Sequence, residues 1–246
     1  MYQTIFLRGP EHAIQFLAAL NYRPPEFAKS HVKALCIRLH IPLTLTVQLL
    51  TLCSGLESLA LWTLPQHNTA QLGNLVSSLP LTFLSLNIMS IFSTLPKSGL
   101  QNHPAIVNLT HLDIVNRWVG WRSSLGIEHL PLLTHVAFRF SSRGSINVAL
   151  SAILRQSPKL QVLVLLADSV AIPGAREYLE KQDIQDIRVV VLRHARDIDN
   201  WQSMERGSVT MWQRADRIVR WRQRNRGWCN GLWMCWRSMI RYSRTV

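Results

Sequence analysis

The chain has 246 residues, of which 48% are apolar and 17% are charged, and its formal net charge is +13. The low charged fraction leaves ample material for a core, and no run reaches the roughly 18 apolar residues that a membrane-spanning helix requires. Residues 214–246 hold nine arginines and one acidic residue, a net charge of +8, which leaves only +5 for the rest of the chain. The body of the protein is therefore not expected to be built around phosphate groups.

The four cysteines form no CxxC pair. Structural zinc sites and thioredoxin-like redox sites use such pairs, so neither is predicted, and we expect reduced thiols. Residues 1–20 include the acidic Glu11 and make a poor signal peptide. We expect a cytoplasmic or nuclear protein without a metal or a cofactor.

The N-terminal residues 1–31 are predicted to form a helical cap. The apolar positions of residues 11–20 share one face of a helix: Ala13, Phe16, Leu17 and Leu20. Pro24 and Pro25 then interrupt the helix before the first repeated phrase.

A six-residue phrase, L-x-x-L-x-L with other aliphatic residues or Phe allowed, recurs seven times. The copies are "VKALCI" (32–37), "LESLAL" (56–61), "LTFLSL" (81–86), "LTHLDI" (109–114), "LTHVAF" (133–138), "LQVLVL" (160–165) and "IRVVVL" (187–192). Their first positions lie 24, 25, 28, 24, 27 and 27 residues apart. Alternate residues of a strand face opposite sides, so the fourth and sixth positions share a face. Seven copies at near-constant spacing indicate a structural repeat.

Stretches with helical spacing lie between the phrases, at residues 43–53, 69–79 and 146–157. A strand, a turn and a helix within 24–28 residues make one coil of a leucine-rich-repeat solenoid. The predicted fold is therefore α/β, a solenoid of about seven strand–helix coils over residues 32–198, with a curved parallel sheet and helical caps. An ordinary doubly wound α/β domain is the alternative, because its buried parallel strands also read as apolar runs.

Residues 199–223 are predicted to form a C-terminal capping helix, since residues 209–221 separate apolar side chains from arginines. The strand positions that should face the concave side are polar or small in the early phrases. In the last two phrases they become apolar: Val162, Val164, Leu166, Val189 and Val191. An apolar surface indicates cover, and we expect the segment around Trp201 to Trp212 to fold over it.

The tail, residues 224–246, is rich in arginine and tryptophan and is expected to be disordered. As a helix it would oppose an apolar side to Arg237, Arg241 and Arg244. Such a segment could lie on an anionic membrane surface, or bind nucleic acid through phosphates with Trp stacking.

No catalytic motif is found in the sequence: there is no GxSxG elbow, no GxxxxGK[ST] loop, no GxGxxG after a strand and no HExxH. The concave positions instead supply a candidate protein-binding face, because arginine and aromatic side chains on a polar patch are typical of hot spots. Its predicted members are Arg38, Trp62, Asn87, His111, Asp113, His135 and Arg139. Stacked strands would also bring Asp113 and His111 near His135, so a hydrolytic or metal site there stays an alternative.

With these residues in view, the chain resembles the leucine-rich-repeat region of fungal F-box-like proteins of the mushroom lineage. The resemblance rests on "EHAIQFLAALNYRPPEFAKSHVKALCI" (11–37), "LCSGLESLALW" (52–62), "LPLLTHVAF" (130–138) and the ending "VVVL…NWQ…MWQRAD", and covers about residues 11–222. It implies that the repeats bind a protein destined for ubiquitination. In that family an F-box docks on the adaptor subunit of a cullin-type ubiquitin ligase. No F-box pattern precedes Val32, so adaptor binding is implied only if an F-box lies upstream.

The sequence therefore predicts a monomeric, non-enzymatic protein–protein interaction module, similar to the substrate-recognition region of an F-box protein. Its expected partner is an unknown protein substrate. A basic peripheral membrane protein or nucleic-acid binder that acts through the Arg/Trp tail is the alternative, and a hydrolase on the concave face is the third hypothesis.

Overall fold

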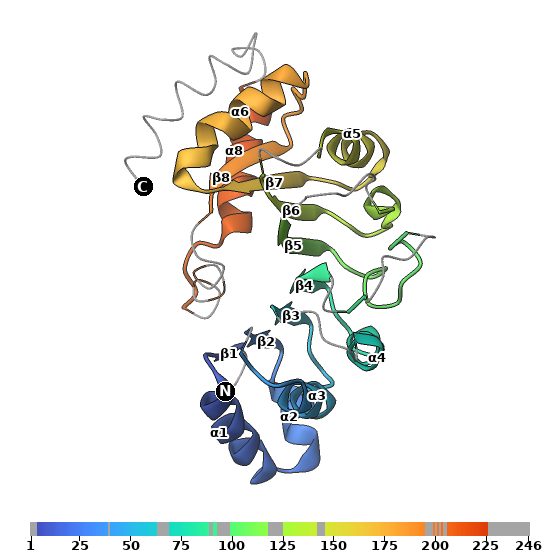
Figure 1. Cartoon of the computed structure of the whole chain (residues 1–246), viewed down its shortest axis with the longest axis vertical. Helices are drawn as coiled ribbons and strands as arrows, with labels where there is room; N and C mark the ends of the chain where they lie inside the picture. The colour runs from blue at the N-terminus through green and yellow to red at the C-terminus, as the bar shows by residue number, and fades with distance from the viewer. Residues whose placement is uncertain are drawn as a thin grey trace.

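A computed structural model describes most of the chain. The described residues are 4–38, 40–62, 69–88, 91–92, 99–117, 125–141, 146–194, 199, 201, 203 and 206–225. They form one sheet of eight parallel strands and seven α-helices (Figure 1). The predicted α/β class with a parallel sheet is confirmed. The predicted disordered tail lies outside the described residues, apart from residues 224 and 225.

The strands lie side by side in chain order, and every neighbouring pair is parallel. They are β1 (Thr4–Leu7), β2 (Ala34–Ile37), β3 (Ser58–Leu61), β4 (Phe83–Leu86), β5 (His111–Arg117), β6 (His135–Arg139), β7 (Val162–Ala167) and β8 (Val189–Arg193). The seven repeated phrases supply β2 to β8. The consecutive order excludes the doubly wound alternative, whose strand order reverses at a switch point.

Strand β1 is not predicted by the repeat, because "TIFL" lacks the full phrase. It pairs with β2 in register, Phe6 beside Cys36. The first 31 residues thus add a strand to the helices α1 (Pro10–Asn21) and α2 (Pro25–His31). The apolar face predicted for residues 11–20 is the buried face of α1.

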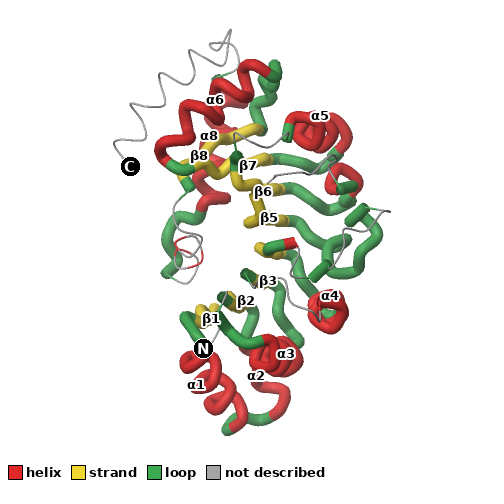
Figure 2. The backbone as a smooth tube through the Cα atoms, viewed as in Figure 1, coloured by secondary structure: helices red, strands yellow, loops and turns green. Residues whose placement is uncertain are grey.

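Helices line one side of the sheet, on the outer side of the arc that the strands follow (Figure 1). They include α3 (Leu43–Leu52), α4 (Thr69–Ser77), α5 (Asn147–Gln156) and α6 (Ile172–Lys181). The first three match the predicted helical stretches. The described parts of the two connections around β5 are instead mostly turns, coloured as loop in Figure 2, with a short 3-10 helix at Ile127–His129.

The fourth and sixth positions of the first six phrases point into the core beneath these helices. In register they align Leu35, Leu59, Leu84, Leu112, Val136 and Leu163 across six strands. All six side chains are fully buried in one continuous apolar cluster with residues of the helices. Each strand therefore packs on its neighbours' equivalent residues, as the repeat requires.

The seventh phrase is shifted by one residue from the predicted alignment. Leu163 of β7 pairs with Val189, where the phrase predicts Val190. A one-residue shift exchanges the two faces of a strand, so Val189 and Val191 face the helices while Val190 faces the opposite side. The prediction that Val189 and Val191 lie on the concave face is wrong.

A second apolar cluster covers the opposite face of the sheet. Helix α8 (Met211–Arg224) contributes Met211, Trp212, Ala215 and Val219, and these pack with Trp201 against Val162, Val164, Leu166 and Val190. Trp201 is only 1% exposed. The predicted cover over the apolar end of this face is confirmed.

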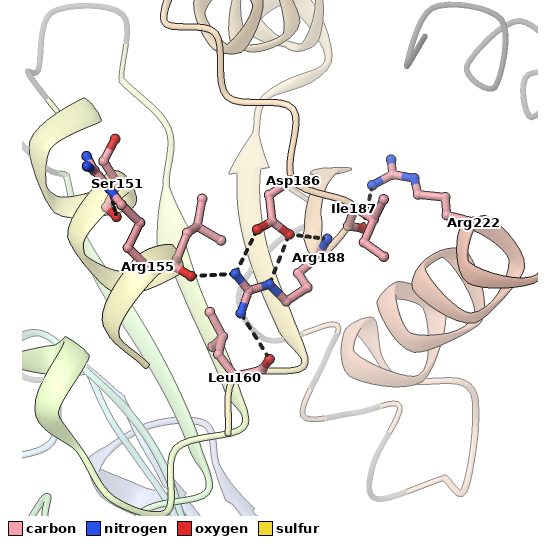
Figure 3. A network of polar contacts seen from close by, with 8 residues as sticks. Ser151, Arg155, Leu160, Asp186, Ile187, Arg188 and Arg222 are labelled. Atoms are coloured by element: carbon pink, nitrogen blue, oxygen red, sulfur yellow. Dashed lines mark hydrogen bonds and ion pairs between the residues drawn. The ribbon is translucent and has the colours of Figure 1, made fainter. Parts of the chain in front are cut away.

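Two arginines hold the last strand from both sides (Figure 3). Arg188 binds Asp186 through Nε and Nη2, at 2.9 and 2.7 Å, and donates to the carbonyl groups of Leu154 and Leu160. Arg222 of α8 donates through Nη1 to the carbonyls of Ile187 and Val189, at 3.0 and 2.6 Å. Burial lowers the pKa of Arg222 to about 10, so it remains charged at neutral pH.

Replacement of Trp212 by Ala should destabilise the protein by about 3–5 kcal/mol, because it empties a site in the second apolar cluster. The free energy of unfolding from urea denaturation measures this loss. Trp221→Ala is the matched control, since Trp221 is half-buried on the same helix. Equal effects of the two substitutions would contradict the packing of α8 on the sheet.

Candidate functional site

Polar side chains gather in the middle of the face that α8 covers. Beneath them lies a ladder of three threonines. Thr82, Thr110 and Thr134 directly precede β4, β5 and β6, respectively. Thr110 Oγ1 donates to the Thr82 carbonyl at 3.0 Å, and Thr134 Oγ1 donates to the Thr110 carbonyl at 3.0 Å. The second position of the phrase therefore links neighbouring strands.

Two histidines, one after each threonine, stack on one another. His111 and His135 are register partners, with ring centroids 4.2 Å apart and planes 8° from parallel. Nδ1 of each lies 2.9 or 2.8 Å from the hydroxyl of the preceding threonine. Each of these threonine hydroxyls therefore bonds both a carbonyl of the preceding strand and the histidine that follows it. The recurrence of "LTH" thus follows from a shared hydrogen-bond pattern.

His135 also attaches α8 to the sheet. Its Nε2 lies 3.2 Å from Oδ1 of Asp216. A carboxylate can only accept, so Nε2–H of His135 donates this hydrogen bond to Asp216. The edge of Trp212 packs on both histidine rings, at 5.4 and 5.6 Å between centroids.

His111 is held in its neutral form. Burial is the main cause that lowers its pKa from 6.5 to about 4, and the neighbouring charge of His135 lowers it further. Asp216 opposes this effect only in part.

A second polar group runs along the centre of the same face. Trp62 Nε1 donates to Ser85 Oγ at 2.9 Å, and Ser85 donates to Asp113 Oδ2 at 2.7 Å. Arg139 binds both oxygens of Asp113, at 2.8 and 3.4 Å. All four side chains are buried, so every polar partner here is needed to offset lost hydration.

The structure brings most of the predicted binding residues together, but not as an open surface. Trp62, Asp113, His135 and Arg139 are buried. Asp113 pairs with Arg139, Trp62 donates to Ser85, and His135 bonds to Asp216 of α8. A protein-binding role for these four residues stays a prediction. Arg38, Asn87 and His111 are half-buried. A binding role for Arg38 and Asn87 stays a prediction.

Asn87 is part of a bridge at the carboxyl ends of β4 and β5. Asn116 donates through Nδ2 to Asn87 Oδ1, and its own Oδ1 accepts from the backbone N–H of Ile88 at 2.6 Å. This bridge fixes the loop that follows β4. The side chains of Asn87 and Asn116 remain partly exposed at the carboxyl edge of the sheet.

Sequence reasoning missed Ser85, Thr110, Thr134 and Asp216. The threonines carried a signal, since the same residue precedes histidine in both "LTH" phrases. Asp216 carried another, because it is the one acidic residue among the nine arginines of residues 214–246.

Most of the printed hydrogen bonds of this network join its own side chains to one another. Thr134, His135 and Asp216 are ordered as in a hydroxyl–histidine–carboxylate triad, but the threonine proton is donated to a backbone carbonyl. Among the described residues, no three or more His, Cys, Asp or Glu side chains are grouped to hold a metal. Burial raises the pKa of the Cys53 thiol to about 12, so it is no nucleophile at neutral pH.

Comparisons with protein-family models, with curated proteins and with solved structures find no match to this chain. None of the described helices has the length and hydropathy to cross a membrane.

Stability should fall as the pH is lowered from about 6.5 to about 4. His111 takes up a proton more readily when unfolded, because its folded-state pKa lies below 6.5. The contribution of neutral His111 to the free energy of unfolding is complete above pH 6.5. It falls by on the order of 3 kcal/mol as the pH is lowered to about 4. His111→Gln, which cannot titrate, should flatten the curve of unfolding free energy against pH. His129→Gln, at an exposed position, should leave it unchanged, and equal curves for both variants would contradict the assignment.

Arg139→Met should cost about 3–5 kcal/mol, because it removes the guanidinium that Asp113 binds within a buried pair. Adding Asp113→Asn should restore part of that stability, since the amide oxygen still accepts from Ser85. A double-mutant cycle of unfolding free energies measures the coupling. If the changes in unfolding free energy of the two single variants simply add in the double variant, the two side chains do not depend on each other.

Proposed function

We propose that this chain is a leucine-rich-repeat solenoid that acts as a non-enzymatic protein-binding module. The fold part of the proposal is supported by the strand order. Seven phrases 24–28 residues apart become adjacent parallel strands in chain order, with helices on one side. Repeat architectures of this kind offer long continuous surfaces for binding.

The binding part is supported by the half-exposed residues at the carboxyl ends of the strands. Arg38 directly follows β2, and Asn87 directly follows β4. Helix α8 packs over β7 and β8 at the other end of the sheet. The surface proposed for a protein partner is therefore the carboxyl edge of β2 to β5, above the Trp62–Asp113–Arg139 group.

The buried group beneath that edge has a supporting role in this proposal. Trp62 follows β3 and lies between the strands that end in Arg38 and Asn87. The hydrogen bond from Trp62 Nε1 to Ser85 Oγ connects the end of β3 to β4. A surface whose base is fixed in this way loses little conformational entropy on binding.

The similarity to fungal F-box-like proteins suggests the partner's class, a protein destined for ubiquitination. The chain would then serve as the substrate-recognition region of a ubiquitin ligase. Contact with the ligase adaptor would require an F-box, and the repeats alone would bind the substrate.

The test starts from crosslinking of the tagged chain in cells, with mass spectrometry to identify the partner and the crosslinked positions. Affinity for the purified partner is then measured for Arg38→Ala/Asn87→Ala. At least a tenfold loss is expected if these residues are hot spots. The matched control is Arg155→Ala/Gln156→Ala, two exposed positions on α5 on the helix side.

Equal affinities for both double variants would contradict the proposed surface. Crosslinks confined to the helices α3 to α6 would contradict it as well. Recruitment to a ligase is a separate question, and co-purification of the adaptor subunit with the full-length protein tests it.

A further inference from the structure

Helix α8 is held on the sheet in one orientation. Thr110 and the other ladder residues position His135, which pairs with Asp216 on one flank of the helix. Arg222 is buried against the start of β8. A capping box between Thr210 and Gln213 fixes the first turn. The opposite face of α8 must therefore point away from the sheet.

That outward face is a row of arginines. Arg214, Arg217, Arg220 and Arg224 are all exposed, and they lie three or four residues apart. They span eleven residues, 214–224, which is about 15 Å along the helix axis. Trp221, half-buried, is one turn from both Arg217 and Arg224.

The charges of this row are not neutralised in the described part of the chain. No described carboxylate lies within ion-pair distance of these four guanidinium groups. Like charges three or four residues apart each destabilise a helix by a few tenths of a kcal/mol. Three such neighbouring pairs occur, so the row lowers the stability of the helix. Acidic residues at some of these positions would have replaced the repulsion by attraction.

The type of residue indicates the type of anion. Only five of the 27 basic residues in the chain are lysines, and α8 has five arginines and no lysine. The planar guanidinium donates two parallel hydrogen bonds to a phosphate, and it stacks on aromatic rings. A half-exposed tryptophan among arginines is typical of surfaces on which nucleobases stack.

A membrane surface fits this helix less well. An interfacial helix inserts its apolar face among the lipid chains. The apolar face of α8, which includes Met211, Trp212 and Val219, is already buried against the sheet. What remains for a ligand is charge and one aromatic ring.

We propose that the outward face of α8, formed by Arg214, Arg217, Arg220, Arg224 and Trp221, binds the sugar–phosphate backbone of single-stranded nucleic acid without sequence preference. The arginines contact successive phosphates, and Trp221 stacks on a base. This surface is distinct from the carboxyl edge proposed for a protein partner.

Fluorescence anisotropy with a labelled 20-nucleotide oligothymidylate tests the proposal on the full chain. Micromolar binding is expected at about 50 mM salt, with a slope of log K against log salt near −2 to −3 for three or four phosphates. Replacing the four outward arginines of α8, Arg214, Arg217, Arg220 and Arg224, by Gln should weaken binding at least tenfold and flatten the slope. Trp221→Ala should weaken binding with little change in slope.

Two matched variants each remove four positive charges elsewhere. One replaces exposed residues of the body, Arg23, Lys29, Arg155 and Lys159, by Gln. The other replaces the tail arginines Arg226, Arg237, Arg241 and Arg244 by Gln. The body variant should bind nearly as well as the parent, and circular dichroism should show that each variant remains folded.

Several outcomes would overturn the proposal. One is absence of salt-sensitive binding, and another is an equal loss in the body variant. A third is a lower affinity of the tail variant for the oligonucleotide while the α8 variant binds as tightly as the parent. Binding to phosphatidylserine vesicles but not to the oligonucleotide would assign the arginines to a membrane surface instead.

Discussion

The alignment of equivalent aliphatic residues on neighbouring parallel strands is the constraint on which the rest of the structure depends. A strand of four residues, such as Ala34–Ile37, cannot bury its own inward side chains. Leu35 is buried because Leu59 lies beside it in register and helices lie beneath both. Each unit is therefore stabilised by its neighbours, and the two ends of the array need other devices. At the last strand that device is α8 together with Arg188 and Arg222.

The side chains on the two faces of the sheet are buried in different ways. The helix side is mainly apolar, and its buried hydroxyl groups, those of Thr46 and Ser157, bond to backbone carbonyls. The opposite side buries Asp113, His135 and Arg139, whose lost hydration must be offset by geometry. Hydrogen bonds from Ser85 and the threonine ladder supply that geometry across successive strands. These polar partners meet only in one register of the strands. The polar face therefore adds specificity to the register that the buried apolar face already favours.

The repeat period was enough to predict seven strands and their order, because side-chain direction in a strand follows from position alone. It was not enough at the ends. "TIFL" is too short to show the phrase, and the run of valines in the seventh phrase fits two registers. The binding face was predicted as exposed because sequence spacing says nothing about where α8 docks. Trp201 was predicted as covered for a physical reason, since an apolar sheet surface must be buried.

Helix α8 explains why one acidic residue stands among so many arginines. Asp216 lies on the flank that meets His135, where a carboxylate attaches the helix to the sheet. Arg222 lies on the buried side, where its guanidinium binds the carbonyls of Ile187 and Val189. The other four arginines of the helix are exposed, and among them Arg220 donates to the Asp216 carbonyl within the helix. If the helix served only to close the sheet, mixed charges on its outer face would be more stable at no cost to packing. The uniform charge of that face is therefore best explained by a ligand outside the fold.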